Sequence, residues 1–269
     1  MKNRSLFLLA VALLGAATGF AQSFRPPSVP LVTFDPYLSI WSPADHLTDH
    51  ATQHWTKREQ SLVSLIRVDG QAFRLMGNDP AGVPALPQTG LQVTPTRSIY
   101  EFANAKIHVT LTFMTPALSY LTWQVRSVDG QEHAVSIYDS TSSQLVVNQA
   151  GEKVQWFRET AGGLTALRIG TVDQPMVGSS GDDHRINWGY AYAAAPGRES
   201  KSAIGANDTL LNDFVANGEL PAADDPQMPR AVNEQQPVMA FVFDLGKVSA
   251  QAVTRQVIVA YDEIAAIKY

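Results

Sequence analysis

Three histidines recur at four-residue intervals in one short stretch of the chain: His46, His50 and His54. On a helix this spacing would place three imidazoles on one face, where their nitrogens bind zinc if a fourth ligand and a second shell are present. Residues 45–54 are otherwise polar, which is also typical of a loop or a single helical turn. The spacing alone leaves both interpretations open.

The same window, residues 34–55, concentrates carboxylates and aromatic rings. These are Asp35, Asp45, Asp49, Tyr37, Trp41 and Trp55. Paired carboxylates, with Asp139 as a further member, do acid/base chemistry at the right separation, but aspartate next to Pro, Ser or Thr more often forms turns and caps. The aromatic rings fit a sugar-stacking platform or a lid, although core or interdomain packing is commoner.

We therefore predict ligand or interdomain contacts within this window and assign no catalytic residue. The candidates are Asp35, Tyr37, Trp41, Asp45, Asp49, His54 and Trp55.

A second run, residues 178–184, holds serine, aspartate and histidine, but Ser179 does not lie in the G-x-S-x-G turn that activates a nucleophile. The pairs Asp182-Asp183 and Asp224-Asp225 lack the alternating spacing of a calcium loop. We interpret them as solvated turns.

Composition narrows the protein class further. With no cysteine, the chain has no thiol nucleophile, no thiolate metal site and no disulfide, so a packed core must supply its stability. The net charge of −5 repels phosphate backbones, which argues against nucleic acid as a partner. We predict no cofactor, and a small-molecule substrate is an open alternative.

Residues 1–21 have the pattern of a secretory signal peptide. Lys2 and Arg4 precede an apolar run, and small residues Gly19 and Ala21 stand where a signal peptidase cuts. The run is shorter than the ~20 residues needed to span a bilayer; the alternative is a buried N-terminal helix. Cleavage would lower the net charge from −5 to −7. We predict a periplasmic or secreted protein without a membrane span.

The elements that position these residues are mostly strands. Two Asp-Gly pairs, Asp69-Gly70 and Asp129-Gly130, separate β-rich runs and predict hairpins at both places. A third hairpin is expected between residues 99–102 and 106–115, where apolar residues alternate with polar ones. Residues 78–89 are rich in Pro and Gly and are expected to form a loop.

Further strands are expected at residues 37–42, 153–159, 164–171, 185–193, 238–245 and 253–261. Residues 207–217 predict the one helix, with Asp208 as N-cap and Gly218 as the stop. The fold class is therefore all-β, a large antiparallel β-sandwich with one short helix. We divide the chain into a signal peptide (1–21), an N-terminal β subdomain (22–77) and the sandwich (78–269).

Several motifs resemble the N-terminal part of the glutaminase-A-like family. They are R-P-P-x-V-P-L-V-T at 25–33, D-P-Y-x-S-I-W-S at 35–42, L-T-D at 47–49, H-W-T at 54–56, I-Y-D-S at 137–140 and V-A-Y-D-E-I at 259–264. The family varies at the positions of His46 and His50, so the resemblance disfavours a metal site there.

The resemblance implies an L-glutamine amidohydrolase whose catalysis lies in a helical toroid that follows the last of these strands. Since the sequence stops at Tyr269, we expect a non-catalytic N-terminal β part, with no glutaminase activity alone, that packs on the helical domain and helps to shape its active site. The alternatives are a carbohydrate-binding accessory domain of a glycoside-processing enzyme and a plain interaction domain.

Overall fold

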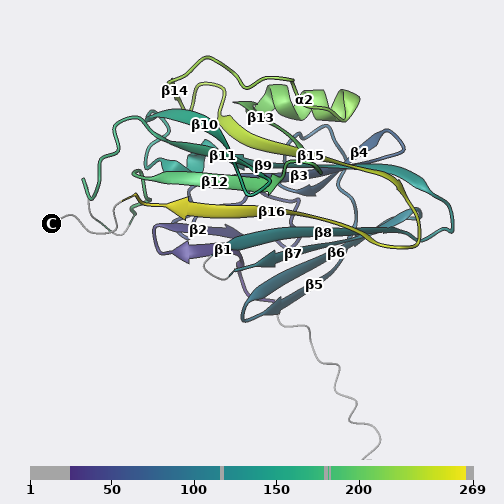
Figure 1. Ribbon diagram of the computed structural model, residues 1–269. Helices are drawn as coiled ribbons and strands as arrows, with labels where there is room; N and C mark the ends of the chain where they lie inside the picture. Colours follow the sequence, from purple (N-terminus) through teal and green to yellow (C-terminus); the bar gives the residue numbers. More distant parts are fainter. Residues whose placement is uncertain (1–24, 116–117, 179–180, 182, 265–269) are drawn as a thin grey trace, which may run out of the picture.

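The computed structural model describes residues 25–115, 118–178, 181 and 183–264, which form a sandwich of antiparallel sheets (Figure 1). The predicted all-β fold class is confirmed. The leader assigned to residues 1–21 lies outside the described residues. Within the described part of the chain, no helix combines the length and apolar character needed to span a bilayer.

The larger sheet has nine strands in the order β14-β10-β11-β12-β16-β8-β7-β6-β5. Their bounds are β14 Arg230–Ala231, β10 Lys153–Ala161, β11 Leu164–Thr171, β12 Tyr190–Pro196, β16 Val253–Asp262, β8 Ser119–Ser127, β7 Ile107–Met114, β6 Arg97–Ala103 and β5 Gln88–Thr94. Strand β7 alternates buried and half-buried residues along its whole length, as its sequence predicts.

The second sheet has five strands in the order β13-β15-β9-β3-β4. Their bounds are β13 Lys201–Ala206, β15 Pro237–Val248, β9 His133–Ser142, β3 Leu62–Val68 and β4 Gln71–Met76. A short hairpin of β1 (Val29–Asp35) and β2 (Leu38–Ser42) forms the third sheet, and a 3₁₀ turn, η1 (Ser143–Val146), follows β9.

The main core lies between the two larger sheets. Trp123 of β8 is fully buried, its ring centroid lies 6.3 Å from that of Phe243 of β15, and its indole N–H donates to Ser64 of β3 at 3.1 Å. These contacts join the sheets across the sandwich. A smaller core lies on the outer face of the five-stranded sheet, where Phe214 of α2 (Asn207–Asn217) packs 5.4 Å from Tyr138.

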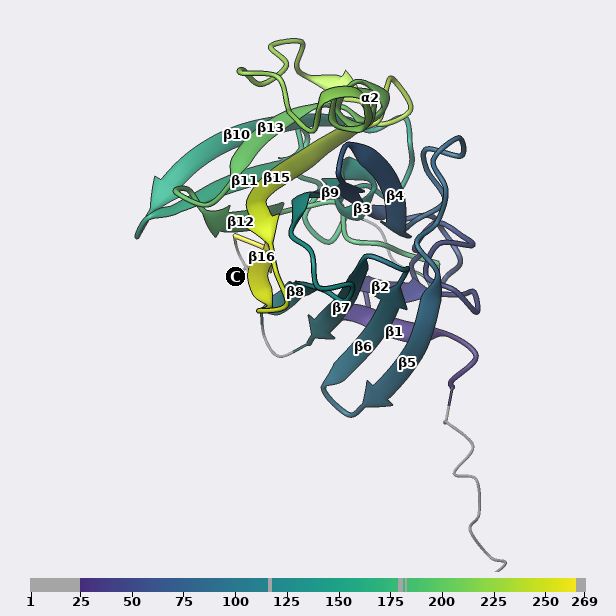
Figure 2. The same ribbon diagram turned by 90° about the vertical axis from the view of Figure 1, so that its right-hand side faces the viewer.

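Figures 1 and 2 show α2 on one side of the five-stranded sheet and the β1–β2 hairpin on the other.

Two of the three predicted hairpins are confirmed, β3–β4 and β6–β7. At the first, Asp69 and Gly70 have φ of 50° and 87°, the left-handed values that this turn needs. The prediction of a hairpin at Asp129-Gly130 is wrong. Strand β8 pairs with β7 and β16, whereas β9 pairs with β3 and β15, so this turn carries the chain from one sheet to the other.

The helix is confirmed at residues 207–217, with Gly218 as its stop at φ 76°. The prediction that Asp208 is the N-cap of this helix is wrong. The N-cap position is Ala206, without a side-chain cap, because the N–H of Asn207 donates to the carbonyls of Gln235 and Gln236 at 3.2 and 3.1 Å. Backbone carbonyls of a neighbouring segment thus accept the hydrogen bond at the start of the helix in place of the expected side chain.

The other strand predictions match with shifted ends; the strand expected at residues 185–193 starts only at Tyr190. Strands β1, β5, β13 and β14 were not predicted, and β5 begins inside the expected loop of residues 78–89. Strands β3 and β4 lie within the five-stranded sheet, on the N-terminal side of the division proposed at residue 77.

Candidate functional site

The turn of the β1–β2 hairpin borders a surface hollow of about 330 Å³. It is lined by Thr33, Phe34, Asp35, Pro36, Ser39, Trp41 and Trp55. Three of the predicted candidates, Asp35, Trp41 and Trp55, therefore come together, although Trp55 lies beyond the hairpin in sequence. Backbone hydrogen bonds between Trp41 and Gln53, at 2.7 and 2.9 Å, bring the second segment against the strand.

Asp35 forms the turn itself. Its Oδ1 accepts the backbone N–H groups of Tyr37 and Leu38 at 2.6 and 3.0 Å, an arrangement typical of aspartate in turns. Its Oδ2 is buried and has no hydrogen-bond partner. The carboxylate of Asp35 thus keeps one buried oxygen without a partner beside the hollow.

His54 supports the hollow from inside the protein. It is fully buried, with Nε2 lying 3.1 Å from the carbonyl of Pro36 and Nδ1 lying 2.9 Å from the hydroxyl of Thr56. Burial lowers the pKa of the His54 imidazole, despite the opposing effect of the Pro36 carbonyl. The Trp55 indole donates to the same carbonyl at 2.6 Å. His54 therefore positions the hairpin turn and Trp55.

The remaining candidates of the window do not line the hollow. Asp45 pairs with Arg25 at 3.1 Å, and Asp49 pairs with the imidazole of His46 at 2.9 Å. The segment around them forms turns and bends, so the three imidazoles do not share a helical face. Across the described ranges, no group of His, Asp and Glu side chains is arranged to hold a metal ion.

The end of β16 borders the same face, although none of its residues is among the site candidates predicted from the sequence. The ring of Tyr261 lies 6.5 Å from Phe34, and its hydroxyl donates to the carbonyl of Trp188. Burial, followed by the negative charges of Asp35 and Asp262, raises the pKa of Glu263. The V-A-Y-D-E-I motif was the signal that this strand end belonged to the face.

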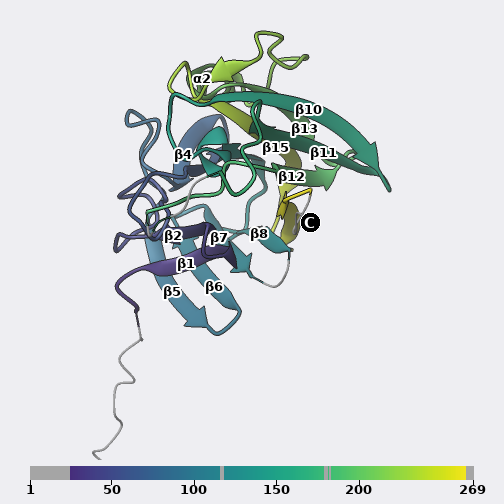
Figure 3. The same ribbon diagram turned by 90° about the vertical axis from the view of Figure 1, so that its left-hand side faces the viewer.

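Exposure sets this face apart. Phe34, Tyr37 and Trp55 are 40%, 47% and 50% exposed, and Trp41 is partly exposed. We call these four residues the aromatic face. Figure 3 shows the β1–β2 hairpin beside β7 and below the five-stranded sheet. Clustered exposed aromatic side chains are typical of contact surfaces.

Asp139, the fourth carboxylate considered, lies far from solvent. It is in register with Ser64 of β3 and Phe241 of β15, on the face that meets Trp123 of the opposite sheet. Both of its carboxylate oxygens are buried without a hydrogen-bond partner, and burial raises the pKa of Asp139 to about 8. It therefore does not form an acid/base pair with Asp35.

Asp224 and Asp225 are ion-paired and partly buried, so the solvated turn predicted there is wrong, whereas Asp183 is exposed as predicted. Asp224 accepts two hydrogen bonds from Arg158, at 2.6 and 3.0 Å, and Asp225 pairs with Arg230 at 2.8 Å. The arginines reach these carboxylates from other strands, which the local spacing does not reveal. Asp183 lies 3.6 Å from Arg185; Ser179, Ser180 and Asp182 lie outside the described residues.

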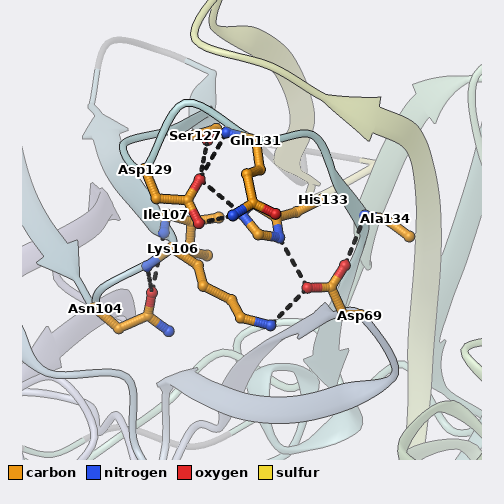
Figure 4. Close-up of polar contacts among 9 residues, drawn as sticks. All are labelled: Asp69, Asn104, Lys106, Ile107, Ser127, Asp129, Gln131, His133 and Ala134. Atoms are coloured by element: carbon orange, nitrogen blue, oxygen red, sulfur yellow. Dashed lines mark hydrogen bonds and ion pairs between the residues drawn. The ribbon is translucent and has the colours of Figure 1, made fainter.

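A second polar cluster joins the two sheets at the opposite end of the sandwich (Figures 1 and 4). His133 lies between two carboxylates, with Nδ1 at 2.8 Å from Asp69 and Nε2 at 3.1 Å from Asp129. Lys106 also donates to Asp69 at 2.7 Å. We call these four residues the histidine clasp. It connects the β3–β4 turn, the β6–β7 turn and the crossover from β8 to β9.

Both ring nitrogens of His133 face carboxylates, so the doubly protonated imidazolium is favoured. Hydrogen bonds to Asp69 and Asp129 raise the pKa of His133. The pKa of Asp69 is lowered by Lys106 first and His133 second, and that of Asp129 by the N–H of Gln131 and then by His133. With both nitrogens engaged, the ring is a structural ion and not a free base.

This arrangement predicts a pH-dependent effect of His133→Gln. The clasp should contribute its full stability below the ordinary histidine pKa of 6.5 and lose it as pH rises through the raised pKa of the folded state. The Tm difference between wild type and His133→Gln should therefore be largest in mild acid and shrink in alkali. A His50→Gln series, measured by thermal unfolding, controls for loss of a histidine, because His50 is exposed and its ring meets the carbonyl of Ala51. A difference that grew with pH would contradict the assignment.

The fold and the aromatic face together define the class of this protein. It is an antiparallel β-sandwich that presents exposed aromatic side chains at its short β1–β2 hairpin. Residues 96–269 match a family model described as a domain of unknown function (DUF5127), and residues 14–88 match a second, DUF4964. The chain belongs to the DUF5127 family.

A search of curated proteins supports the wider relationship. The chain is 28% identical to Glutaminase A of Aspergillus oryzae over 272 aligned residues, which cover 92% of this chain and 39% of that protein. Together with the two domain matches, this confirms the resemblance to the glutaminase-A-like family. The chain spans well under half the length of this relative.

Solved structures give weaker likenesses. A galactose mutarotase related enzyme from Lactobacillus acidophilus is 8% identical with a TM-score of 0.47, covering 90% of this chain and 100% of that one. A protein from the human microbiome, provisionally described as a kojibiose phosphorylase, is 9% identical with a TM-score of 0.45, covering 90% of this chain and 30% of that one. At these values neither likeness bears on function.

Proposed function

We propose that this chain is the non-catalytic N-terminal β-sandwich part of a glutaminase-A-like protein and that its aromatic face packs on a helical catalytic domain. The observation that carries the proposal is the exposure of Phe34 and Trp55 at the hollow, and of Tyr37 in the adjoining turn, on a backbone that is firmly hydrogen-bonded. A rigid scaffold with exposed aromatic rings suits a partner surface, because little further ordering is needed on contact.

The partner is inferred from the relationship in sequence. The curated relative is named Glutaminase A and is much longer than the part that this chain matches. We therefore propose that the complete assembly hydrolyses L-glutamine to glutamate and ammonia, with the nucleophile and base in the helical domain. The Asp35 carboxylate, with one buried oxygen unpartnered, would border that domain and help to shape its active site.

The setting that we propose is the periplasm or the outside of the cell. Its support is the signal-peptide pattern of residues 1–21. On its own, the purified chain is expected not to hydrolyse glutamine.

The decisive test is the double variant Trp41→Ala, Trp55→Ala. Since both rings are at least partly exposed, we expect its unfolding free energy to fall by no more than about 1–2 kcal/mol, against about 3–5 kcal/mol for a buried tryptophan. Binding to the helical part of a glutaminase-A-like relative, supplied in trans, should weaken at least tenfold. Thermal unfolding and calorimetry measure the two effects.

Trp123→Ala is the matched control, because Trp123 is fully buried between the sheets. It should lose stability heavily, and whatever folded protein remains should bind the helical partner normally. Severe destabilisation of the double variant without a specific loss of partner binding would reject the proposed interface.

A carbohydrate-binding accessory domain is the second candidate. Trp41, Trp55 and Asp35 line one hollow, and aromatic rings beside a carboxylate suit a sugar ring. Glycan binding by the isolated chain that disappears in Trp41→Ala would favour this function over the helical interface.

A further inference from the structure

A groove of about 500 Å³ lies beyond the C-terminal end of α2. Its floor is the outer face of the five-stranded sheet, where Arg67, Ser136 and Asp244 stand in register on three neighbouring strands. One wall is formed by the end of α2, with Gly218, and the other by the β12–β13 connection and Arg255 of β16. We call it the α2 groove.

The groove gathers positive charge on an acidic protein. Its cationic residues are Arg67, Arg198, Lys201 and Arg255, and its acidic residues are Glu199, Glu219 and Asp244. The formal balance is thus one positive charge in the groove, whereas the whole chain carries −5. Such a local excess attracts anions by raising their concentration at the mouth of the cavity.

Several of these charges are already partly engaged. Lys201 pairs with Glu219 at 2.5 Å. Arg67 donates to the carbonyl of Gly70 at 2.9 Å and to that of Phe214, near the C-terminal end of α2, at 3.5 Å. These bonds place the Arg67 guanidinium beneath Gly218 and oppose the partial negative charge of the helix end.

Two arginines that line the groove nevertheless have a guanidinium donor without a partner. The Nε atoms of Arg67 and Arg255 are buried and have no hydrogen-bond acceptor. The nearest carboxylate oxygen to Nε of Arg255, on Glu199, lies 3.6 Å away, which is beyond hydrogen-bond distance. A buried donor without an acceptor is costly, so both guanidinium groups keep unmatched positive charge beside the groove, which favours an oxygen-rich anion there.

We propose that the α2 groove binds a small oxyanion, a carboxylate or phosphate compound, held by Arg67 and Arg255 and attracted by Arg198. The groove lies on the outer face of the five-stranded sheet, and the aromatic face lies across that sheet at the β1–β2 hairpin (Figure 2). The site is therefore independent of the function proposed above and stands or falls separately from it.

The test uses isothermal titration of the full chain with citrate, with inorganic phosphate and with uncharged galactose, at about 0.15 M salt to screen weak surface attraction. We expect saturable binding of at least one anion and none of galactose. Citrate and phosphate, titrated separately, distinguish a carboxylate from a phosphate ligand. Arg255→Gln removes one of the two unused donors and should weaken binding about tenfold or more.

Arg198→Gln is the variant least able to disturb folding, because Arg198 is exposed and makes no ion pair with any described residue. It should weaken binding several-fold through charge alone. Arg97→Gln, at the exposed first residue of β6 and outside the groove, is the matched control and should bind like wild type.

Failure of both anions to bind, binding of galactose in their place, or equal weakening by Arg97→Gln and Arg198→Gln would overturn the proposal. Amide chemical-shift changes on adding the anion, mapped to Ser136 and Gly218 and not elsewhere, would locate the ligand even if Arg255→Gln folded poorly.

Discussion

Gly189→Ala is expected to destabilise the chain by roughly 3 kcal/mol, since two separate costs add at this position. Gly189 has φ of 80°, a left-handed conformation that costs alanine about 1–2 kcal/mol. A methyl group there would also lie 2.8 Å from the Cα of Glu263, which, like the carbonyl of Asp262, is backbone and not a flexible side chain. Relieving that overlap should cost about 1–3 kcal/mol more.

Gly130→Ala separates the two costs. Gly130 has the same φ of 80°, but no atom lies within 4 Å of the position that an alanine methyl group would take there. It should therefore lose only the conformational part, about 1–2 kcal/mol, in the same denaturant titration. Equal losses in both variants would mean that the close approach of the β12 start to the end of β16 is not a constraint.

The substitution Gly189→Ala should also change the structure near the aromatic face. Trp188 precedes Gly189 and accepts the hydroxyl of Tyr261, whose ring packs near Phe34. Displacing the end of β16 should thus alter the surroundings of Phe34, which the near-ultraviolet circular dichroism of the aromatic residues would report. No comparable change is expected for Gly130→Ala, at the other end of the sandwich.

The second large effect is expected at Asp139, whose replacement by asparagine should remove a pH-dependent loss of stability. The folded state holds the pKa of Asp139 at about 8, against an ordinary value of 3.8. Between these values the unfolded chain releases the proton while the folded chain keeps it, so stability falls as pH rises. At about 1.4 kcal/mol per pH unit, the loss reaches up to about 4 kcal/mol by neutral pH.

Asp139→Asn cannot ionise, so its unfolding free energy should stay nearly level over this range and exceed that of wild type in mild alkali. Denaturant titrations at several pH values measure the slope directly. Asp173→Asn, at an exposed position, is the matched control and should follow the wild-type curve. A wild-type slope that survives in Asp139→Asn would show that another group causes it.

Short-range chemistry in the sequence was enough to determine several elements of the fold. Asp69-Gly70 forms its hairpin because both residues adopt positive φ, and residues 107–114 alternate in burial because successive strand side chains point to opposite faces. The helix at residues 207–217 ends at Gly218 since glycine accepts the left-handed stop. Each of these features depends on neighbours within a few residues.

Strand partners were decided only by the tertiary structure. Asp129-Gly130 carries the same turn signal as Asp69-Gly70, and Gly130 does adopt φ of 80°, yet the strands on either side belong to different sheets. A turn sets the direction of the chain locally, whereas the edge that the next strand joins depends on packing with distant strands. In this crossover the carboxylate of Asp129 binds His133 within the histidine clasp.

The candidate functional site was likewise predicted only in part from the sequence. Residue types in the window at 34–55 indicated a contact surface, and Asp35, Trp41 and Trp55 do border one hollow. The sequence could not show that Asp45 and Asp49, which are close to them along the chain, do not line this hollow. These two aspartates pair instead with Arg25 and His46. Nor could the sequence bring in Tyr261 and Glu263, which lie more than two hundred residues away in sequence. Which side chains share a surface is settled by sheet pairing and burial, because those alone bring distant segments together.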